Sequence, residues 1–258
     1  MLRTESRGGI ALLTLDRADR GNALSPELVD ALQGALDAAI ADAEIHTLAL
    51  RASGRHFCTG FDLSDLDASS DGDLLLRFVR VEALLTTLWH APIRTVAIAQ
   101  GRAWGAGADI FATCDERLAC DDASFRFPGP GFGLVLGTRR LAARAGVDLA
   151  RRWTIEGSQV DARTAAQTGL ATAVFAAGVD PLETISARPA IRQETAAALR
   201  SATRPDHRDA DLAALVRSAS EPGLRDRIAA YRDGLRSATG KISLPATERG
   251  SRGSRSDP

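Results

Sequence analysis

Residues 101–114 constrain the fold more than any other stretch of the sequence. An apolar run at 94–100 predicts a buried strand, which leads into the small-residue turn Trp104-Gly105-Ala106-Gly107. Residues 108–113 are then expected to form a helix. The N–H groups at a helix start have no internal partner, and glycines let another molecule approach the backbone closely. The turn is therefore a candidate binding surface.

Strands and helices are predicted to alternate along the first two thirds of the chain. Ser25 followed by Pro26 is a typical helix start, and Pro92 is expected to end a long helix. Such an alternation predicts an α/β protein. The other expected strands cover residues 8–16, 47–51 and 116–119, and the expected helices cover 26–43, 73–89, 137–156 and 161–168.

The organisation changes after residue 180, where only helical patterns remain, punctuated by prolines. We therefore expect a core at residues 1–180 and a C-terminal helical region at 181–240. Residues 241–258 are rich in Ser, Gly and Arg and are expected to form a disordered tail. The Asp- and Ser-rich residues 62–71 are expected to be mobile.

The composition excludes several classes of protein. The chain has 258 residues, of which 45% are hydrophobic and 25% charged, as is typical of a globular protein. A net charge of −1 gives no overall attraction to nucleic acid or to an anionic membrane, and no apolar run reaches the roughly 18 residues of a membrane span. Three cysteines without a CxxC spacing predict neither a disulfide framework nor a metal site. We expect a cytoplasmic protein.

Three motifs, in order along the chain, carry a resemblance to a known family. They are Asn22-Ala23-Leu24, the loop at residues 56–63 (HFCTGFDL) and the turn and helix at residues 101–109 (GRAWGAGAD). A later matching segment lies at residues 156–170. Together these motifs resemble those of the crotonase (enoyl-CoA hydratase/isomerase) superfamily.

The resemblance implies a crotonase-type spiral of repeated ββα units, followed by C-terminal helices that pack on a neighbouring subunit. Members of the superfamily are commonly trimers or dimers of trimers, so a homotrimer or hexamer is expected, with residues 181–240 as the trimerisation region. The implied substrate is an acyl-coenzyme A, with no separate cofactor. The implied chemistry stabilises a thioester enolate, as in an enoyl-CoA hydratase or isomerase.

By resemblance, the backbone N–H groups of Phe61 and Ala106 hold the thioester oxygen. Ala106 is expected at a helix start, where the dipole is positive, and Gly60 would allow a tight turn before Phe61. A glycine-rich helix start that serves only packing is the alternative. The resemblance also assigns a substrate-binding role to Asn22, Ala23, Leu24, Phe57, Gly60, Asp62, Leu63, Trp104, Gly105 and Gly129.

The family's hydratases use two glutamates, and this sequence departs from that pattern at both positions. The first falls at Asp109, which keeps the acid on a shorter side chain, and the second falls at Gly129, which has none. The family's isomerases carry their acid near Leu136-Gly137, where none is present. Asp109 is thus the candidate catalytic acid, although it could instead serve only the helix start. Weak or absent hydration is expected.

Three functions remain open on these residues. The chain could be an acyl-CoA enzyme of the hydratase/isomerase type, an acyl-CoA-binding protein of the same fold, or an enzyme for another thioester reaction such as decarboxylation or hydrolysis. A fourth motif, residues 131–137 (GFGLVLG), hints at dinucleotide binding. It follows two prolines, and Arg151 stands where an acid for the ribose belongs, so that function is disfavoured.

Other reactive side chains are given structural roles. His56 and His90 are isolated in the sequence and are expected to lie on the surface or in packing contacts. Cys58 is expected to be a small core residue, and Glu82 is expected on a solvated helix face.

Overall fold

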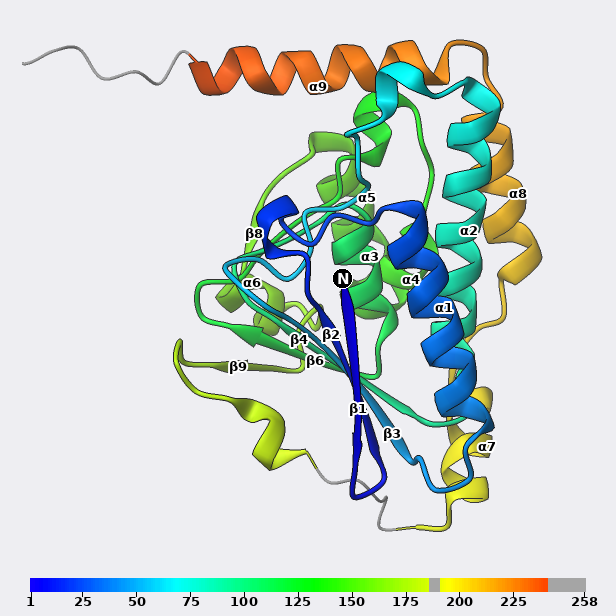
Figure 1. The fold of residues 1–258 in the computed structure, drawn as a ribbon, viewed down its shortest axis with the longest axis vertical. Helices are drawn as coiled ribbons and strands as arrows, with labels where there is room; N and C mark the ends of the chain where they lie inside the picture. Colours follow the sequence, from blue (N-terminus) through cyan, green and yellow to red (C-terminus); the bar gives the residue numbers. More distant parts are fainter. Residues whose placement is uncertain (186–190, 241–258) are drawn as a thin grey trace, which may run out of the picture.

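A six-stranded sheet in the order β1-β2-β3-β4-β6-β9 forms the centre of the protein (Figure 1). This computed structural model describes residues 1–185 and 191–240, with the side chains of 235–240 left out. The expected tail at 241–258 lies outside the described residues. The strands are β1 (Leu2–Arg7), β2 (Ile10–Leu15), β3 (Thr47–Ala52), β4 (Arg94–Ala99), β6 (Glu116–Cys120) and β9 (Ala173–Phe175).

Strand β1 was not expected from the sequence. It pairs antiparallel with β2, whereas β2, β3, β4, β6 and β9 are parallel. Five of its six residues are exposed, because an edge strand buries little and so shows no alternating apolar pattern. The turn into β2 is made by Gly8 and Gly9, both with positive φ.

A smaller sheet joins β5 (Arg102–Trp104), β7 (Ser124–Arg126) and β8 (Val160–Asp161). The chain passes from β4 to β5 through Gly101, whose φ is +56°. A Cβ there would lie 2.1 Å from the carbonyl oxygen of Arg55, so only glycine fits. Strands β4 and β5 and the helix after them form one ββα unit, as the crotonase-type fold requires.

Helices cover one face of the large sheet, where α1 (Pro26–Ala41) and α2 (Asp71–Trp89) lie side by side (Figure 1). The side chain of Ser25 accepts the N–H of Leu28, which confirms the expected helix start. The helix expected at 137–156 is wrong as a single element, because Gly146 has a φ of +85° that an α-helix cannot contain. It divides α4 (Thr138–Ala145) from α5 (Val147–Glu156); α3 (Ala106–Thr113) and α6 (Ala162–Gln167) complete this part.

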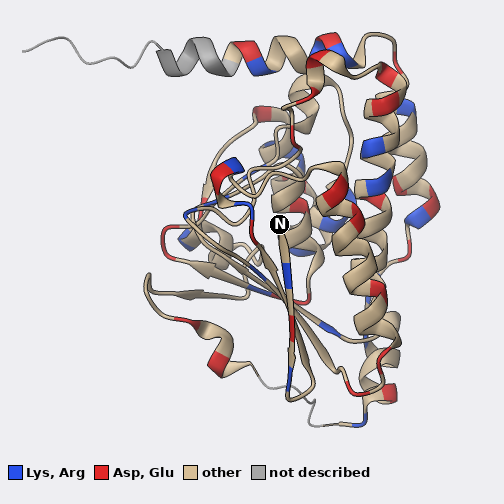
Figure 2. Ribbon diagram, viewed as in Figure 1, with Lys and Arg blue, Asp and Glu red and all other residues tan. Residues whose placement is uncertain are grey.

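The C-terminal region is helical where the structure describes it. After η4 (Pro181–Thr184) and α7 (Gln193–Thr203), α8 (Arg208–Ala219) packs along α2, and α9 (Leu224–Gly240) crosses the end of α2 (Figure 1). Figure 2 shows both signs of charge mixed along these outer helices. Within residues 1–185 and 191–240, no helix combines the length and apolar character that crossing a bilayer requires.

Helix α9 also contacts η2 (Leu66–Ala68) and η3 (Gly129–Phe132). Leu66 is fully buried in a second apolar cluster with Phe78, Leu134 and Ile228. Apolar contacts from α2 and α9 hold the middle of residues 62–71, and the expected mobility of this segment stays a prediction.

One buried side chain joins the first loop to the second. Asn22 is fully buried, and its Nδ2 donates to the carbonyl oxygens of Ser53 and His56 at 2.9 and 2.8 Å. Its Oδ1 accepts the N–H of Arg17 at 2.8 Å. The φ of Asn22 is +54°, a conformation that asparagine adopts more readily than most residues.

We predict that Asn22→Ala lowers the free energy of unfolding by about 2–4 kcal/mol, because buried backbone groups lose their partners and the left-handed backbone becomes strained. Asn22→Gly should lose less, since glycine accepts this φ without strain. Urea unfolding measures both changes. Equal losses of unfolding free energy in the two variants would show that the left-handed backbone at residue 22 contributes nothing to the difference in stability.

Candidate active site

A cavity of about 170 Å³ lies where α3, η3 and α9 meet the loop after β3. Its lining is mostly apolar. Eight of the residues singled out in the sequence line it: Gly60, Phe61, Leu63, Trp104, Gly105, Ala106, Asp109 and Gly129.

The two loops that the sequence singled out run side by side at this cavity. Cys58 pairs in parallel with Ala103, donating its N–H to Arg102 at 3.1 Å and accepting that of Trp104 at 2.9 Å. Gly60 has a φ of +105°, and a Cβ there would lie 2.9 Å from the carbonyl oxygen of Trp104. Glycine at residue 60 therefore permits the close contact.

The direction of the Phe61 N–H follows from the peptide before it. The carbonyl oxygen of Gly60 accepts the N–H of Leu24 at 2.8 Å. The described chain has no cis peptide bond, and the C=O and N–H of a trans peptide point in opposite directions. The N–H of Phe61 therefore points away from Leu24. Within the described chain it donates to no acceptor.

The second N–H belongs to the first residue of α3. Gly105 is the N-cap and Ala106 the first helical residue, so the N–H of Ala106 has no partner within the helix. No other acceptor for it occurs among the described residues. Phe61 and Ala106 thus both border the cavity, and the backbone N–H of each has no acceptor among the described residues.

Packing fixes both donors in place. The ring of Phe61 stacks on Phe78 with centroids 4.2 Å apart, and the Arg77 guanidinium lies 4.1 Å from the Phe61 ring. Gly107 presses on Cys58, where a Cβ would lie 2.4 Å from the Cys58 carbonyl oxygen. At the far end of α3, Arg144 donates to Ala112 and Cys114 carbonyl oxygens, each at 3.0 Å.

Asp109 stands one turn into α3 with its carboxyl at the cavity. The residue is 6% exposed, and no described residue donates a hydrogen bond to the carboxylate oxygens. Burial raises the pKa of Asp109 well above its ordinary value; Arg140 opposes this shift and Glu82 adds to it. The N-cap of α3 is Gly105 and no side chain caps it, so Asp109 is not the cap of the helix.

Glycines lie at both positions where an additional acid was considered. A Cβ at Gly137 would lie 2.2 Å from Oδ1 of Asp109, so this residue packs directly against the carboxyl. Gly129 borders the same cavity from η3, and a Cβ there would lie 3.2 Å from the Leu134 carbonyl oxygen. Asp109 is the one carboxylic acid among the described residues that line the cavity.

A family model described as enoyl-CoA hydratase/isomerase matches residues 5–222. The chain belongs to the enoyl-CoA hydratase/isomerase family. This confirms the crotonase resemblance and the α/β fold with its helical C-terminal region.

Three relatives show how far the similarity extends. A Bordetella parapertussis crystal structure, provisionally named an enoyl-CoA hydratase/isomerase, is 42% identical with a TM-score of 0.86, covering 90% of this chain and 98% of that one. The echA6 protein of Mycobacterium leprae, provisionally named an enoyl-CoA hydratase, is 34% identical over 175 residues, 65% of this chain and 68% of the relative. Enoyl-CoA hydratase domain-containing protein 3, mitochondrial, of Danio rerio is 30% identical, and the match spans 67% of this chain but 61% of the relative.

Five residues that the family resemblance assigned to substrate binding are not on the cavity. Asn22, Ala23, Leu24, Phe57 and Asp62 are buried in the loops behind it. The carboxylate of Asp62 accepts from Arg17 at 2.5 Å and from the N–H of Ser64 at 2.9 Å. These residues support the loop that carries Phe61, and a direct role in binding stays a prediction.

The expectation that Glu82 lies on a solvated helix face is wrong. It is 2% exposed, and its carboxylate accepts from both terminal nitrogens of Arg140, at 3.1 and 2.6 Å. Thr86 and Asp211 surround the same guanidinium. The helical pattern of α2 did not show this burial, because the partner lies 58 residues further along the chain.

The far wall of the cavity was also missed by sequence reasoning. Phe78 on α2, Leu134 after η3, and Ile228 and Tyr231 on α9 line it. All four stand outside the family motifs. For Phe78, Ile228 and Tyr231 the only signal is the ordinary apolar periodicity of a packed helix, and Leu134 lies in a loop.

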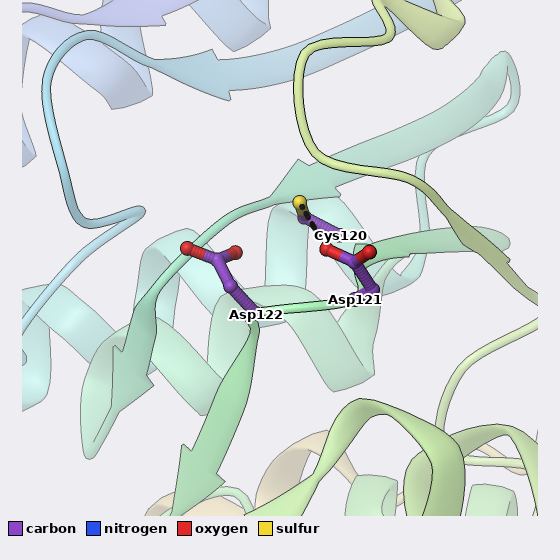
Figure 3. A group of neighbouring side chains, drawn as sticks. All are labelled: Cys120, Asp121 and Asp122. Carbon is purple, nitrogen blue, oxygen red and sulfur yellow. Dashed lines mark hydrogen bonds between the residues drawn. The ribbon is translucent and has the colours of Figure 1, made fainter.

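The remaining reactive groups have structural partners. Burial raises the pKa of the Cys58 thiol to about 12, and Nδ1 of His56 accepts the N–H of Arg102 at 3.2 Å. Figure 3 shows Cys120, Asp121 and Asp122, whose possible ligand atoms lie within 4.8 Å of one another. Their carboxylates accept backbone N–H groups of Ala177 and Gly101, and burial raises the pKa of the Cys120 thiol to about 11. The group holds a turn together.

We predict that Asp109→Asn stabilises the protein, and increasingly so as the pH rises. Between the ordinary and the raised pKa, the folded protein keeps a proton that the unfolded chain releases, so the stability of the unmodified protein falls with pH in this window. Asparagine cannot ionise and escapes this loss. Each pKa unit corresponds to about 1.4 kcal/mol, or about 2–4 °C in Tm.

Thermal unfolding of both proteins at pH 5 and pH 8.5 measures the effect. Asp65→Asn is the matched control, because Asp65 is half exposed and already paired with Arg77 at 2.7 Å. If the gain in Tm of Asp109→Asn over the unmodified protein is smaller at pH 8.5 than at pH 5, the fold stabilises the Asp109 carboxylate and the prediction is wrong.

Proposed function

We propose that this protein is an acyl-CoA enzyme of the hydratase/isomerase type which stabilises the enolate of a thioester and moves one proton at its α-carbon. The thioester of coenzyme A is the substrate, and the proposal includes no separate cofactor. The observation that carries the proposal is an apolar cavity bordered by two residues with unpaired N–H donors and by one buried, unpaired carboxyl.

The donors suit a carbonyl oxygen that gains negative charge. Phe61 and Ala106 border the same cavity from two loops in direct contact, and the start of α3 adds a positive dipole. Preorganised N–H groups in a site with little water stabilise such a charge, and one donor typically contributes about 10²–10³ in rate. We propose that these two groups form the oxyanion hole.

Asp109 has the properties of a proton carrier. A raised pKa makes its carboxylate a stronger base than an ordinary aspartate, and its neutral form a proton donor nearer to neutral pH. It would take the α-proton as the enolate forms and return a proton as the enolate collapses. Removal of the α-proton needs the ionised form of Asp109. The rate should therefore rise with pH through the raised pKa of Asp109 and then level off.

We predict that removing one N–H donor abolishes most of this chemistry. Proline is tolerated at the first position of a helix, so Ala106→Pro deletes that N–H while keeping α3. Exchange of the α-protons of butyryl-CoA in D₂O, followed by NMR, should slow by about 10²–10³. Ala106→Gly keeps the N–H and is the control.

The exchange assay is independent of which product the enzyme makes. If Ala106→Pro still binds butyryl-CoA and exchanges its α-protons as fast as the unmodified protein, the proposed oxyanion hole is wrong. Tight binding of butyryl-CoA with no exchange in the unmodified protein would favour the acyl-CoA-binding alternative, which the missing acid at Gly129 supports.

We further predict that hydration of crotonyl-CoA is slow. Adding water needs one group to activate the water and another to deliver the proton, and a misplacement of about 1 Å can cost about 10²-fold. With Gly129 in place of an acid, the unmodified protein should fall at least about 10²-fold below a two-glutamate hydratase of the family, measured by loss of the enoyl thioester absorbance.

Asp109→Glu combined with Gly129→Glu should raise the hydration rate, and Asp109→Glu with Gly129→Gln should not. The new side chain has to displace the Leu134 carbonyl oxygen by a few tenths of an ångström, so the first test is the unmodified protein. Efficient hydration by that protein would show that another residue replaces the second acid.

A further inference from the structure

We infer that the acyl group this site takes is uncharged and apolar, about the size of one six-membered ring, and that Tyr231 sets the limit on its length. The inference rests on the proposed function, since it names the substrate class of the same site. It goes beyond the family, whose motifs do not include the far wall of the cavity.

The volume and lining set the class of acyl group. The cavity measures about 170 Å³, close to the roughly 150 Å³ of an engineered apolar cavity that accepts benzene. Leu134 lines the cavity after η3, Ile228 and Tyr231 line it from α9, and Phe78 lines it from α2, where it stacks on Phe61. The thioester occupies part of this space, so a group of about six carbons, straight or cyclic, is the upper limit for the acyl group.

Charge divides the cavity into two sides. Arg126 lies on β7 beside Trp104, next to the turn that carries Ala106. Its Nε donates to the Gly157 carbonyl oxygen at 2.8 Å. The polar part of coenzyme A suits this side. The wall built by α2, Leu134 and α9 contributes no charged side chain among the described lining residues, so a carboxylate on the acyl group would be desolvated without a partner.

The depth of the cavity is limited by packed side chains. Phe78, Leu134 and Ile228 are 2%, 2% and 1% exposed and belong to the apolar cluster under α9. A longer chain would have to displace them, and interiors this closely packed resist such displacement.

Tyr231 is the one part of this wall that can be removed without opening the cluster. It is half-buried and packs on Gly131, where a Cβ would lie 3.2 Å from its ring. Its ring centroid is 5.4 Å from that of Phe132. Tyr231→Ala should therefore lengthen the cavity at a modest cost in stability.

Isothermal titration of the unmodified protein with coenzyme A and its acetyl, butyryl, hexanoyl, benzoyl, succinyl and palmitoyl thioesters tests the class. Affinity should rise about fourfold per methylene up to hexanoyl, with benzoyl in the same range and palmitoyl no tighter. Succinyl-CoA should bind at least tenfold more weakly than butyryl-CoA, which has the same number of carbons. Succinyl-CoA binding as tightly as butyryl-CoA or more tightly, or palmitoyl-CoA binding more tightly than hexanoyl-CoA, overturns the inference.

The variant tests the role of Tyr231. Tyr231→Ala should bind decanoyl-CoA at least tenfold more tightly than the unmodified protein, while the control Leu212→Ala, on an exposed site of α8, should not. Tyr231→Leu, a milder change, should show a smaller gain in the same direction if the alanine variant does not fold. No gain in a folded Tyr231 variant overturns the role of this residue.

The same titrations distinguish a failure of the proposed function from a failure of the inference on the acyl group. If none of the thioesters binds more tightly than coenzyme A itself, the acyl site is absent and both proposals fall. A clear preference for a charged or a long acyl group leaves the enolate chemistry standing and removes only the inference on substrate class.

Discussion

The site depends on one close contact between two stretches of backbone. Residues 58–61 and 103–106 run in parallel, and Gly60 and Gly107 make the close approach of the two segments possible, while Gly105 supplies a φ of +52°. At Gly60 and Gly107 any side chain would overlap backbone atoms of the facing loop. Because the contact leaves the N–H groups of Phe61 and Ala106 unpaired at one cavity, packing geometry and binding chemistry have the same origin.

Stability and chemistry oppose each other at Asp109. A buried carboxyl without a hydrogen-bond donor destabilises the fold once it ionises, and the same burial would suit the proton transfer that we propose for it. Glu82 and Arg140, buried nearby, differ because the Glu82 carboxylate accepts from both terminal nitrogens of Arg140. Removing one partner of such a pair typically costs about 3–5 kcal/mol, so that pair tolerates change less well than Asp109.

Part of the cavity is lined by residues that are remote in sequence from the paired loops. Ile228 and Tyr231 reach it from α9, and Arg227 holds that helix to η3 by donating to the Phe132 carbonyl oxygen at 3.0 Å. The family motifs lie on the loop at 56–63 and on α3. In the proposed function, the groups that act on the thioester and those that select the acyl group therefore lie largely on different elements.

The sequence by itself determined the α/β class, the helix start at Ser25, the glycine turn and the acid at residue 109. The α/β class follows from the alternation of local patterns along the chain, and the others depend on motifs contained within a few neighbouring residues. Tertiary structure alone decided the burial of Glu82 by Arg140, the pairing of β1 and the wall formed by Ile228 and Tyr231. Burial and partners depend on contacts between residues far apart in the chain, and the polarity of a single segment carries no record of what will pack against it.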